Sequence, residues 1–176
     1  MKIRKEELRS IILDLDNWEA NGLDPKKGLV LLGNVGVGKT TCMESLIELK
    51  HRKHDGNPLK GHHYSQREIN GHGSYNEFQK GRSLDKYQCF VDDIGDSGLS
   101  VVKNYGSISS PVGDLIFNRS ELYKKEVVWC HNTKFNYFTS NHFMEDLKEM
   151  FGDQIEDRLF GMCNIVIVTG ESYRRQ

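Results

Sequence analysis

An eight-residue segment, GNVGVGKT (Gly33 to Thr40), constrains this chain more than any other feature of its sequence. It satisfies the pattern G-x-x-x-x-G-K-[ST] and stands between a predicted buried strand (28–32) and a predicted helix (40–53). Glycines let backbone N–H groups turn inward around phosphate oxygens, and the start of the helix adds positive potential. The alternative, a glycine-rich turn before a helix, is disfavoured by this complete strand–loop–helix context.

The segment therefore predicts a site for nucleotide phosphates and Mg²⁺. Lys39 is expected to reach the β- and γ-phosphates, and the Thr40 hydroxyl to ligate Mg²⁺. Thr41 either helps to hold the α-phosphate or caps the helix. The predicted nucleotide-binding residues of the loop are Gly33, Asn34, Val35, Gly36, Val37, Gly38, Lys39, Thr40 and Thr41.

A second apolar strand, YQCFV (87–91), leads into two carboxylates, Asp92 and Asp93. Asp92 at the strand tip is expected to hold Mg²⁺ through water. Asp93 is then placed to orient or deprotonate an attacking water. The competing interpretation is a pair of turn-forming aspartates, and the phosphate loop upstream favours the metal and water roles.

Predicted strands and helices alternate along the rest of the chain, which indicates a parallel sheet covered on both faces. Residues 66–86 have few apolar anchors, and 50–63 and 95–111 are predicted to be polar or loop-like. The remaining predicted elements are helices over 5–20, 112–123, 143–151 and 151–162, and strands over 135–139 and 164–170.

Composition narrows the class of protein. A chain of 176 residues fits a single domain, and a net charge of −1 neither demands nor excludes nucleic acid. With no apolar run near the length of a membrane span and no secretory signal, we expect a cytoplasmic protein without a membrane segment. Four separated cysteines are expected to be reduced, mostly buried thiols: Cys42, Cys89, Cys130 and Cys163.

Further segments carry a family resemblance. The chain resembles the AAA+ ATPases of the DnaC-type helicase-loader and IstB-type transposition-helper group. This resemblance implies an α/β fold of the P-loop NTPase type (an AAA+ core), with a parallel five-stranded sheet flanked by helices, and ATP as the nucleotide. The matching segments are GLVLLGNVGVGKTT, VDDIG, FTSN, FGDQIEDRLFGM and TGESYR, in this order between residues 28 and 174.

The resemblance also assigns roles to three polar residues. Asn141 matches the sensor that contacts the γ-phosphate side and the attacking water, although it also suits a helix N-cap for 142–151. Arg158 matches the arginine finger that acts on the ATP of a neighbouring subunit. Arg174 is similar to the second sensor arginine, with a tail residue as the alternative.

Arg158 also has a simpler interpretation as a solvated helix residue, because its helix carries an ordinary apolar stripe. The chain departs from the family pattern at two positions that bear on the rate of ATP hydrolysis. Asp93 stands where most relatives have Glu. Gln154 stands where many relatives carry another arginine. The stripe consists of Ile155, Leu159 and Met162.

The implied partners are single-stranded DNA, a replicative helicase or transposase, and further copies of the chain in a head-to-tail homo-oligomer. Two basic stretches suit phosphate contacts, with Tyr75 and Phe78 as base-stacking candidates, or else form solvated polar faces. The stretches consist of Lys50, Arg52, Lys53 and Lys60, and of Lys80, Arg82 and Lys86.

We expect one AAA+ domain over 1–176, with a leading helix and linker over 1–27 and no separate lid domain. Those leading residues are too few for the additional N-terminal domain of DnaC-type loaders. Two other functions stay open: a small-molecule P-loop kinase, which would leave the TSN and GDQIEDRL segments unexplained, and a nucleotide-dependent adaptor that hydrolyses weakly.

Overall fold

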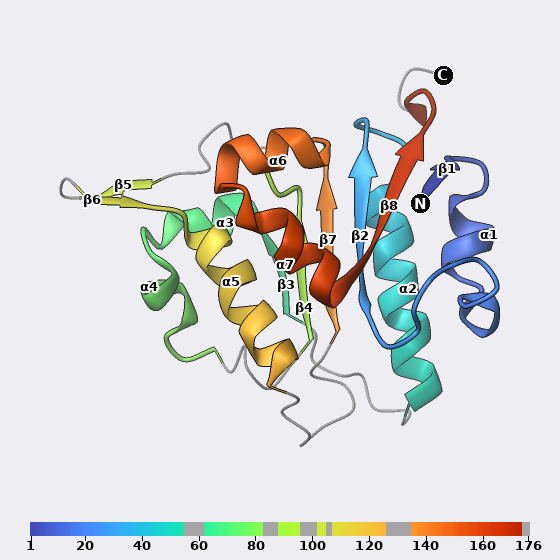
Figure 1. Cartoon of the computed structure of the whole chain (residues 1–176), viewed down its shortest axis with the longest axis horizontal. Coiled ribbons are helices and arrows are strands. Elements are labelled where there is room, and N and C mark those ends of the chain that lie inside the picture. The colour runs from blue at the N-terminus through green and yellow to red at the C-terminus, as the bar shows by residue number, and fades with distance from the viewer. Residues whose placement is uncertain (55–61, 83–87, 96–101, 105–106, 126–134, 174–176) are drawn as a thin grey trace.

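The chain forms a parallel six-stranded sheet with helices on both faces in this computed structural model (Figure 1). The structure describes residues 1–54, 62–82, 88–95, 102–104, 107–125 and 135–173. The sheet has the order β1-β8-β2-β7-β4-β3, and a separate antiparallel pair is formed by β5 and β6. The strands are β1 (Lys2–Arg4), β2 (Gly28–Gly33), β3 (His62–Ser65), β4 (Cys89–Asp92), β5 (Val102–Asn104), β6 (Ser107–Ser109), β7 (Asn136–Ser140) and β8 (Cys163–Thr169).

Two layers of helices cover the sheet. The helices α1 and α2 lie against one face, and α3 to α7 lie against the other. The helices are α1 (Leu8–Ile12), α2 (Lys39–His54), α3 (Gln66–Gly71), α4 (Tyr75–Gln79), α5 (Pro111–Lys124), α6 (Met144–Phe151) and α7 (Gln154–Met162), with a short 3-10 helix over Leu15–Asn17.

The central strands are buried on both faces, which is why they are apolar without alternation. In β2, Leu29 and Leu31 pack among residues of α1 and α2, whereas Val30 and Leu32 pack among residues of α3 to α7. All four side chains are fully buried. The apolar run 28–32 therefore supplies both halves of the core.

The sheet has six strands rather than the expected five. The extra strand β1 pairs in parallel with β8, so that Ile3 lies opposite Val168. Three residues are too few to show periodicity, and only Ile3 of β1 is buried. Strand β3 was not expected either, because its sequence HHYS has no apolar run.

Helical structure near the N-terminus is shorter than the expected helix over 5–20. The apolar residues at helical spacing are divided between α1 and the 3-10 helix over Leu15–Asn17. Part of the predicted loop 95–111 is β5 and β6, which pair as Val102 with Ser109. The other predicted elements agree with the structure to within a few residues at their ends.

The cysteine prediction is confirmed where the structure describes it. Cys42, Cys89 and Cys163 are buried and free of disulfides. Burial raises the pKa of Cys42 and of Cys89 to about 11, so both thiols stay protonated at neutral pH. Cys130 lies outside the described residues. Among the described helices, none combines the length and apolarity needed to span a bilayer.

An ammonium group is buried at the far end of α2. Lys50 is only 8% exposed, and its Nζ lies 4.2 Å from the ring centroid of Trp18 and 4.1 Å from that of Phe135. No hydrogen-bond partner meets this Nζ. Burial lowers the pKa of Lys50 to about 8, below its ordinary value of 10.5. Cation–π attraction thus offsets only part of the desolvation cost.

We predict that Lys50→Met stabilises the fold at pH 7 by about 1–2 kcal/mol, since it removes a desolvated charge and keeps the apolar stem. The folded-state pKa of Lys50 lies below its unfolded value, so the unfolded chain binds more protons between pH 8 and 10.5. The wild type therefore gains stability as the pH rises through this window, and the advantage of the variant shrinks.

Urea unfolding of both proteins at several pH values tests this prediction. Lys26→Met, at an exposed position, is the matched control and should give no such pH dependence. An unchanged or lower stability of Lys50→Met at pH 7 would contradict the argument.

Candidate functional site

The polar residues of the candidate site gather at the carboxyl edge of the sheet. The strands are parallel, so the loops after β2, β4 and β7 and the end of β8 all meet there (Figure 1). Gly33 ends β2 with a φ of 146°, and a Cβ at this position would lie 2.2 Å from the carbonyl oxygen of Val168. Only glycine therefore allows β2 to enter the phosphate loop beside β8.

Lys39 links the phosphate loop to the neighbouring strand. Its Nζ donates hydrogen bonds to the carbonyl oxygens of Gly33 (2.7 Å) and Asn34 (2.8 Å). It also donates to Oδ1 of Asn141, at 2.9 Å. The side chain is only 4% exposed, so this cation is held at the floor of the site rather than in solvent.

The acidic strand end meets the hydroxyl of the loop. Thr40 Oγ1 donates to Asp92 Oδ1 at 3.0 Å, and Thr139 Oγ1 donates to the same oxygen. The backbone N–H of Asp93 donates to Thr139 Oγ1 at 2.9 Å. This hydroxyl–carboxylate pair is the ligand type that Mg²⁺ prefers, and it joins the two residues predicted as metal ligands, Thr40 and Asp92.

Asp93 leaves the strand in an unusual conformation. Its φ of 55° is the only positive value at a non-glycine among the described residues. Such strain is characteristic of functional sites. Asn141 Nδ2 donates to Asp93 Oδ1 at 3.2 Å, so the two predicted catalytic residues lie side by side. The predicted metal and water roles of Asp92 and Asp93 stay predictions.

The helix-cap interpretation of Asn141 is wrong in this structure. Helix α6 begins after Phe143, whose N–H donates to Asp146 Oδ2 at 2.9 Å. The Asn141 side chain instead bridges Lys39 and Asp93, the residues at the phosphate end of the site.

A cavity of about 380 Å³ opens above these residues. This volume falls within the range of small-molecule sites, and the lining combines loop backbone, a cation, hydroxyls and a carboxylate. The donor set therefore fits a nucleoside triphosphate with Mg²⁺. The cavity is lined by Val35, Gly36, Gly38, Lys39, Thr40, Thr41, Asp93, Asn141 and Tyr173.

The remaining predicted nucleotide-binding residues have different positions. Gly33 and Asn34 contact Lys39 through their carbonyl oxygens, and Val37 is buried in the core. Arg174 lies outside the described residues, so its assignment stays a prediction.

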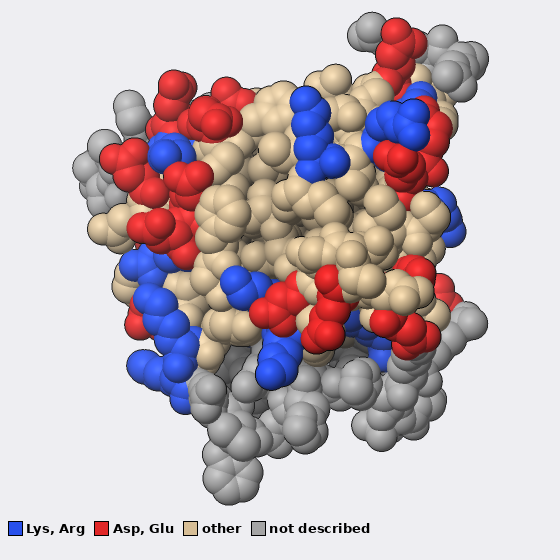
Figure 2. Space-filling model, turned by 45° about the vertical axis from the view of Figure 1, so that its right-hand side comes forward, with Lys and Arg blue, Asp and Glu red and all other residues tan. Residues whose placement is uncertain are grey.

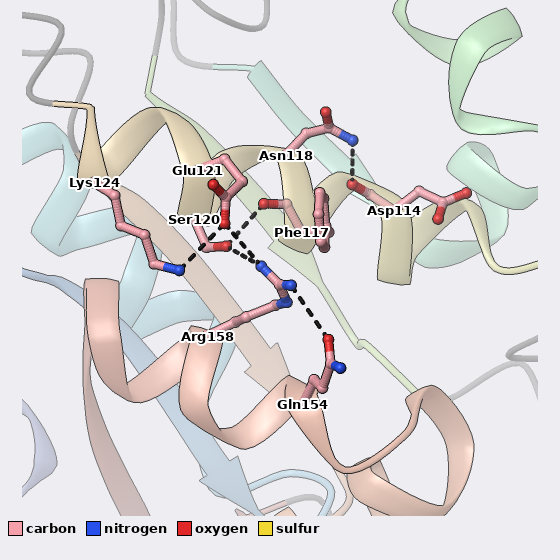
Figure 3. A network of polar contacts seen from close by, with 8 residues as sticks. All are labelled: Asp114, Phe117, Asn118, Ser120, Glu121, Lys124, Gln154 and Arg158. Atoms are coloured by element: carbon pink, nitrogen blue, oxygen red, sulfur yellow. Dashed lines mark hydrogen bonds and ion pairs between the residues drawn. The ribbon is translucent and has the colours of Figure 1, made fainter.

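Arg158 lies away from this cavity, on α7, and its guanidinium points toward α5 (Figure 3). Nη1 donates to Ser120 Oγ (2.9 Å) and to Glu121 Oε1 (3.3 Å). Nη2 donates to Gln154 Oε1 at 3.3 Å. The guanidinium carbon also lies 3.8 Å from the ring centroid of Phe117, in a cation–π contact. Arg158 is therefore held by its own chain, with its side chain 15% exposed.

The stripe beside Arg158 packs as expected, since Ile155, Leu159 and Met162 are all buried. Phe117, in contrast, is 45% exposed although it contacts the guanidinium. Arg158 thus lies on a helix whose apolar stripe is buried, and its guanidinium contacts an aromatic ring that is accessible to solvent. Its finger role stays a prediction.

The first basic stretch is not an intact surface in the described residues. Lys50 is buried among aromatic rings, so it is unavailable to DNA phosphates. Lys60 lies outside the described residues, and nothing is described of the side chains of Arg52 and Lys53. Lys and Arg on the face in Figure 2 are interspersed with Asp and Glu around a broad uncharged area.

The second stretch is also partly occupied. Lys80 pairs with Glu77, and Arg82 donates to the Phe78 carbonyl oxygen and lies over the Phe78 ring. Lys86 lies outside the described residues. The base-stacking assignment of Tyr75 and Phe78 is wrong, because their side chains are 8% and 0% exposed and belong to the core.

Two residues of the site were not anticipated from the sequence. Thr139 is fully buried and hydrogen bonds to both aspartates, and its signal was a hydroxyl beside the aromatic pair Tyr137 and Phe138 of the strand. Tyr173 lines the cavity, and its N–H donates to the Gly36 carbonyl oxygen at 2.9 Å. The sequence gives no signal for this role, because a single tyrosine after a strand matches no nucleotide-binding motif.

No family model and no curated protein sequence matches this chain. Solved structures share its fold. One is a candidate primosome component from Streptococcus pyogenes serotype M3, with a TM-score of 0.54 and 17% identity over 96% of this chain and 81% of that chain. Another is domain III of the replication initiation protein DnaA from Thermotoga maritima, with a TM-score of 0.55, 15% identity and 97% of this chain covered.

This chain spans 62% of the DnaA domain III chain. At these identities the likeness concerns the fold. The expected fold class, a parallel α/β sheet flanked by helices, is confirmed, with one strand more than expected.

We predict that Thr139→Val lowers the free energy of unfolding by about 2–3 kcal/mol. The change removes the two hydrogen bonds of the Thr139 hydroxyl, one to the Asp92 carboxylate and one from the N–H of Asp93. Thr139→Ser keeps the hydroxyl and loses only a methyl group, which costs about 1 kcal/mol. Chemical denaturation of the three proteins is the measurement, and equal stabilities of the valine and serine variants would refute the assigned role.

Proposed function

We propose that this chain is a Mg²⁺-dependent ATPase of the DnaC-type loader and IstB-type helper kind, working in DNA replication or transposition. The observation that carries this proposal is the bonded set of Lys39, Asn141 and Asp93, with Thr40 and Asp92 beside it, around one cavity. The fold shared with a candidate primosome component and a replication initiator supports a replication-related role.

In this proposal the phosphate loop and Lys39 bind the triphosphate, and Thr40 and Asp92 hold Mg²⁺, which when bound neutralises charge on the phosphate oxygens. Asp93 orients the attacking water and accepts its proton. Asn141, which already contacts Lys39 and Asp93, reports on the γ-phosphate side. In the structure, Lys39 satisfies its donors on two loop carbonyls, contacts that a bound triphosphate would replace.

We further propose that Arg158 acts in trans, on ATP held by the next subunit of a head-to-tail oligomer. Its contacts in the single chain are compatible with release, because Glu121 and Gln154 are at least partly exposed and water can reach them when the guanidinium leaves. The pKa of Glu121 is lowered by hydrogen bonds from Lys124 first and from Arg158 second. Lys124 can therefore keep Glu121 paired when Arg158 leaves.

Single-stranded DNA and a replicative helicase or transposase are the proposed partners. The three residues of the predicted basic stretches whose side chains the structure describes, Lys50, Lys80 and Arg82, are buried or paired. The family resemblance and the likeness to replication proteins support DNA as a partner.

We predict that Lys39→Ala weakens ATP binding by more than tenfold, because it removes the one lysine that lines the cavity in the described part of the chain. Isothermal titration with ATP and Mg²⁺ measures this, with Lys80→Ala as a control at an exposed, paired lysine. Wild-type protein that binds ATP no more tightly than Lys39→Ala would refute the nucleotide site.

We predict that Arg158→Ala lowers phosphate release at least 100-fold and leaves ATP affinity within a factor of two. Wild-type turnover per chain should rise with protein concentration, since each site would need a second subunit. Mixing Arg158→Ala with Lys39→Ala should restore part of the activity, because one variant retains a nucleotide site and the other a finger.

Arg9→Ala, at an exposed arginine on α1, is the control for the loss of a positive charge. Equal phosphate release by the wild type and Arg158→Ala would exclude action in trans. A mixture of Arg158→Ala and Lys39→Ala that is as inactive as either variant alone would exclude it as well. Phosphate release near zero in the wild type, with ATP binding intact, would favour the weakly hydrolysing adaptor. A phosphorylated small molecule in an acceptor screen would favour the kinase.

A further inference from the structure

Tyr173 lines the candidate nucleotide cavity. It follows β8, whose carboxyl end lies at the same edge of the sheet as the loop after β2 (Figure 1). Its backbone N–H donates to the Gly36 carbonyl oxygen at 2.9 Å, which ties the segment after β8 to the phosphate loop. A Cβ built on Gly38 would lie 3.9 Å from Cε2 of the ring, so the ring itself borders the loop.

The ring is braced from the protein side by a lysine. Lys5 Nζ lies 4.0 Å from the Tyr173 ring centroid and donates to the Glu171 carbonyl oxygen at 2.6 Å. The stem of Lys5 packs beside Gly170, where a Cβ would lie 2.8 Å from Lys5 Cγ. Lys5 is only 8% exposed, so the cation occupies a fixed position against the ring.

The same ring is still accessible to a ligand. Tyr173 is 48% exposed and lines the cavity together with Val35, which is 51% exposed. These two side chains contribute apolar surface to the lining of the cavity. Lys39, Asp93 and Asn141 contribute a cation and a carboxylate bridged by an amide. A nucleotide likewise combines a flat base with charged phosphates.

We propose that Tyr173 is the base-binding residue of this site, with its cavity-side face stacking on the purine of a nucleoside triphosphate and Lys5 positioning the ring from behind. The inference rests on the proposed nucleotide function and adds the part of the ligand that the phosphate loop does not recognise. Stacking uses the π-face that every base offers, so Tyr173 supplies affinity for a base and little preference between adenine and guanine.

Two ligands separate this role from a purely structural one. ATP has a base and inorganic tripolyphosphate has none, while both present a triphosphate to the loop. Tyr173→Ala should weaken ATP binding about 5- to 100-fold, as expected for loss of one stacked base. The same variant should change tripolyphosphate binding less than twofold, and Tyr173→Trp should keep ATP affinity within a factor of three.

The experiment is isothermal titration of the full chain with each ligand in the presence of Mg²⁺. Phe160→Ala removes an aromatic ring of similar exposure (50%) outside the cavity lining and is the matched control. Equal weakening of ATP and tripolyphosphate by Tyr173→Ala would overturn the inference, because the ring would then only support the loop. Unchanged ATP affinity in Tyr173→Ala would overturn it as well.

The two levels of proposal fail differently. If the wild type and Tyr173→Ala bind ATP with equal affinity, and tripolyphosphate with equal affinity, the base-binding role is excluded. The proposed nucleotide function is then unaffected. A wild-type chain that binds neither ligand overturns the nucleotide function itself, and the base-binding role with it.

Discussion

The candidate site depends on one buried ammonium group. Lys39 Nζ contacts the carbonyl oxygens of Gly33 and Asn34 and the side chain of Asn141, so a single cation joins the ends of β2 and β7. A lysine buried to this degree is costly unless its donors are satisfied. In this structure they are satisfied by groups that a triphosphate could replace, which makes the loop both ordered and receptive.

The central part of the fold was predictable from sequence for a physical reason. A parallel strand buried on both faces must be an apolar run, so residues 28–32 could be recognised as one from the sequence. Strands β1 and β3 lie at the two edges of the sheet, where one side of each strand has no neighbour and polar residues are tolerated. Short or polar edge strands leave no periodic signal, and the pairing that creates them is not local.

The site shows the same division. Lys39, Thr40, Asp92 and Asp93 follow apolar strands or a glycine loop, so the sequence pattern indicated their roles at one site. Asn141 was indicated by the family resemblance. Thr139 was hidden because its partners lie on another strand, and its hydroxyl is meaningful only once β4 and β7 are paired. Tyr75, Phe78 and Lys50 show the converse error, since residue type suggests nucleic acid whereas burial places them in the core.

Arg158 illustrates how one residue can satisfy a motif and still have local partners. Its guanidinium needs hydrogen-bond acceptors in any state of the molecule, and in the single chain α5 supplies them (Figure 3). Ser120, Glu121 and the Phe117 ring hold the side chain in place without burying it completely. A subunit contact would therefore exchange one set of partners for another, and would not have to desolvate a free cation.

The pairing of β1 with β8 has a consequence for the order in which the molecule assembles. Lys2 pairs with Ile167 and Arg4 with Thr169, which joins segments from opposite ends of the sequence. Contacts so remote along the chain carry a large loop-closure entropy and are expected to form late. Lys5 follows β1 at the same edge of the sheet, and its ammonium group lies against the ring of Tyr173. Fraying of these three backbone pairs would thus loosen the support of the Tyr173 ring while the phosphate loop, inside the sheet, stayed folded.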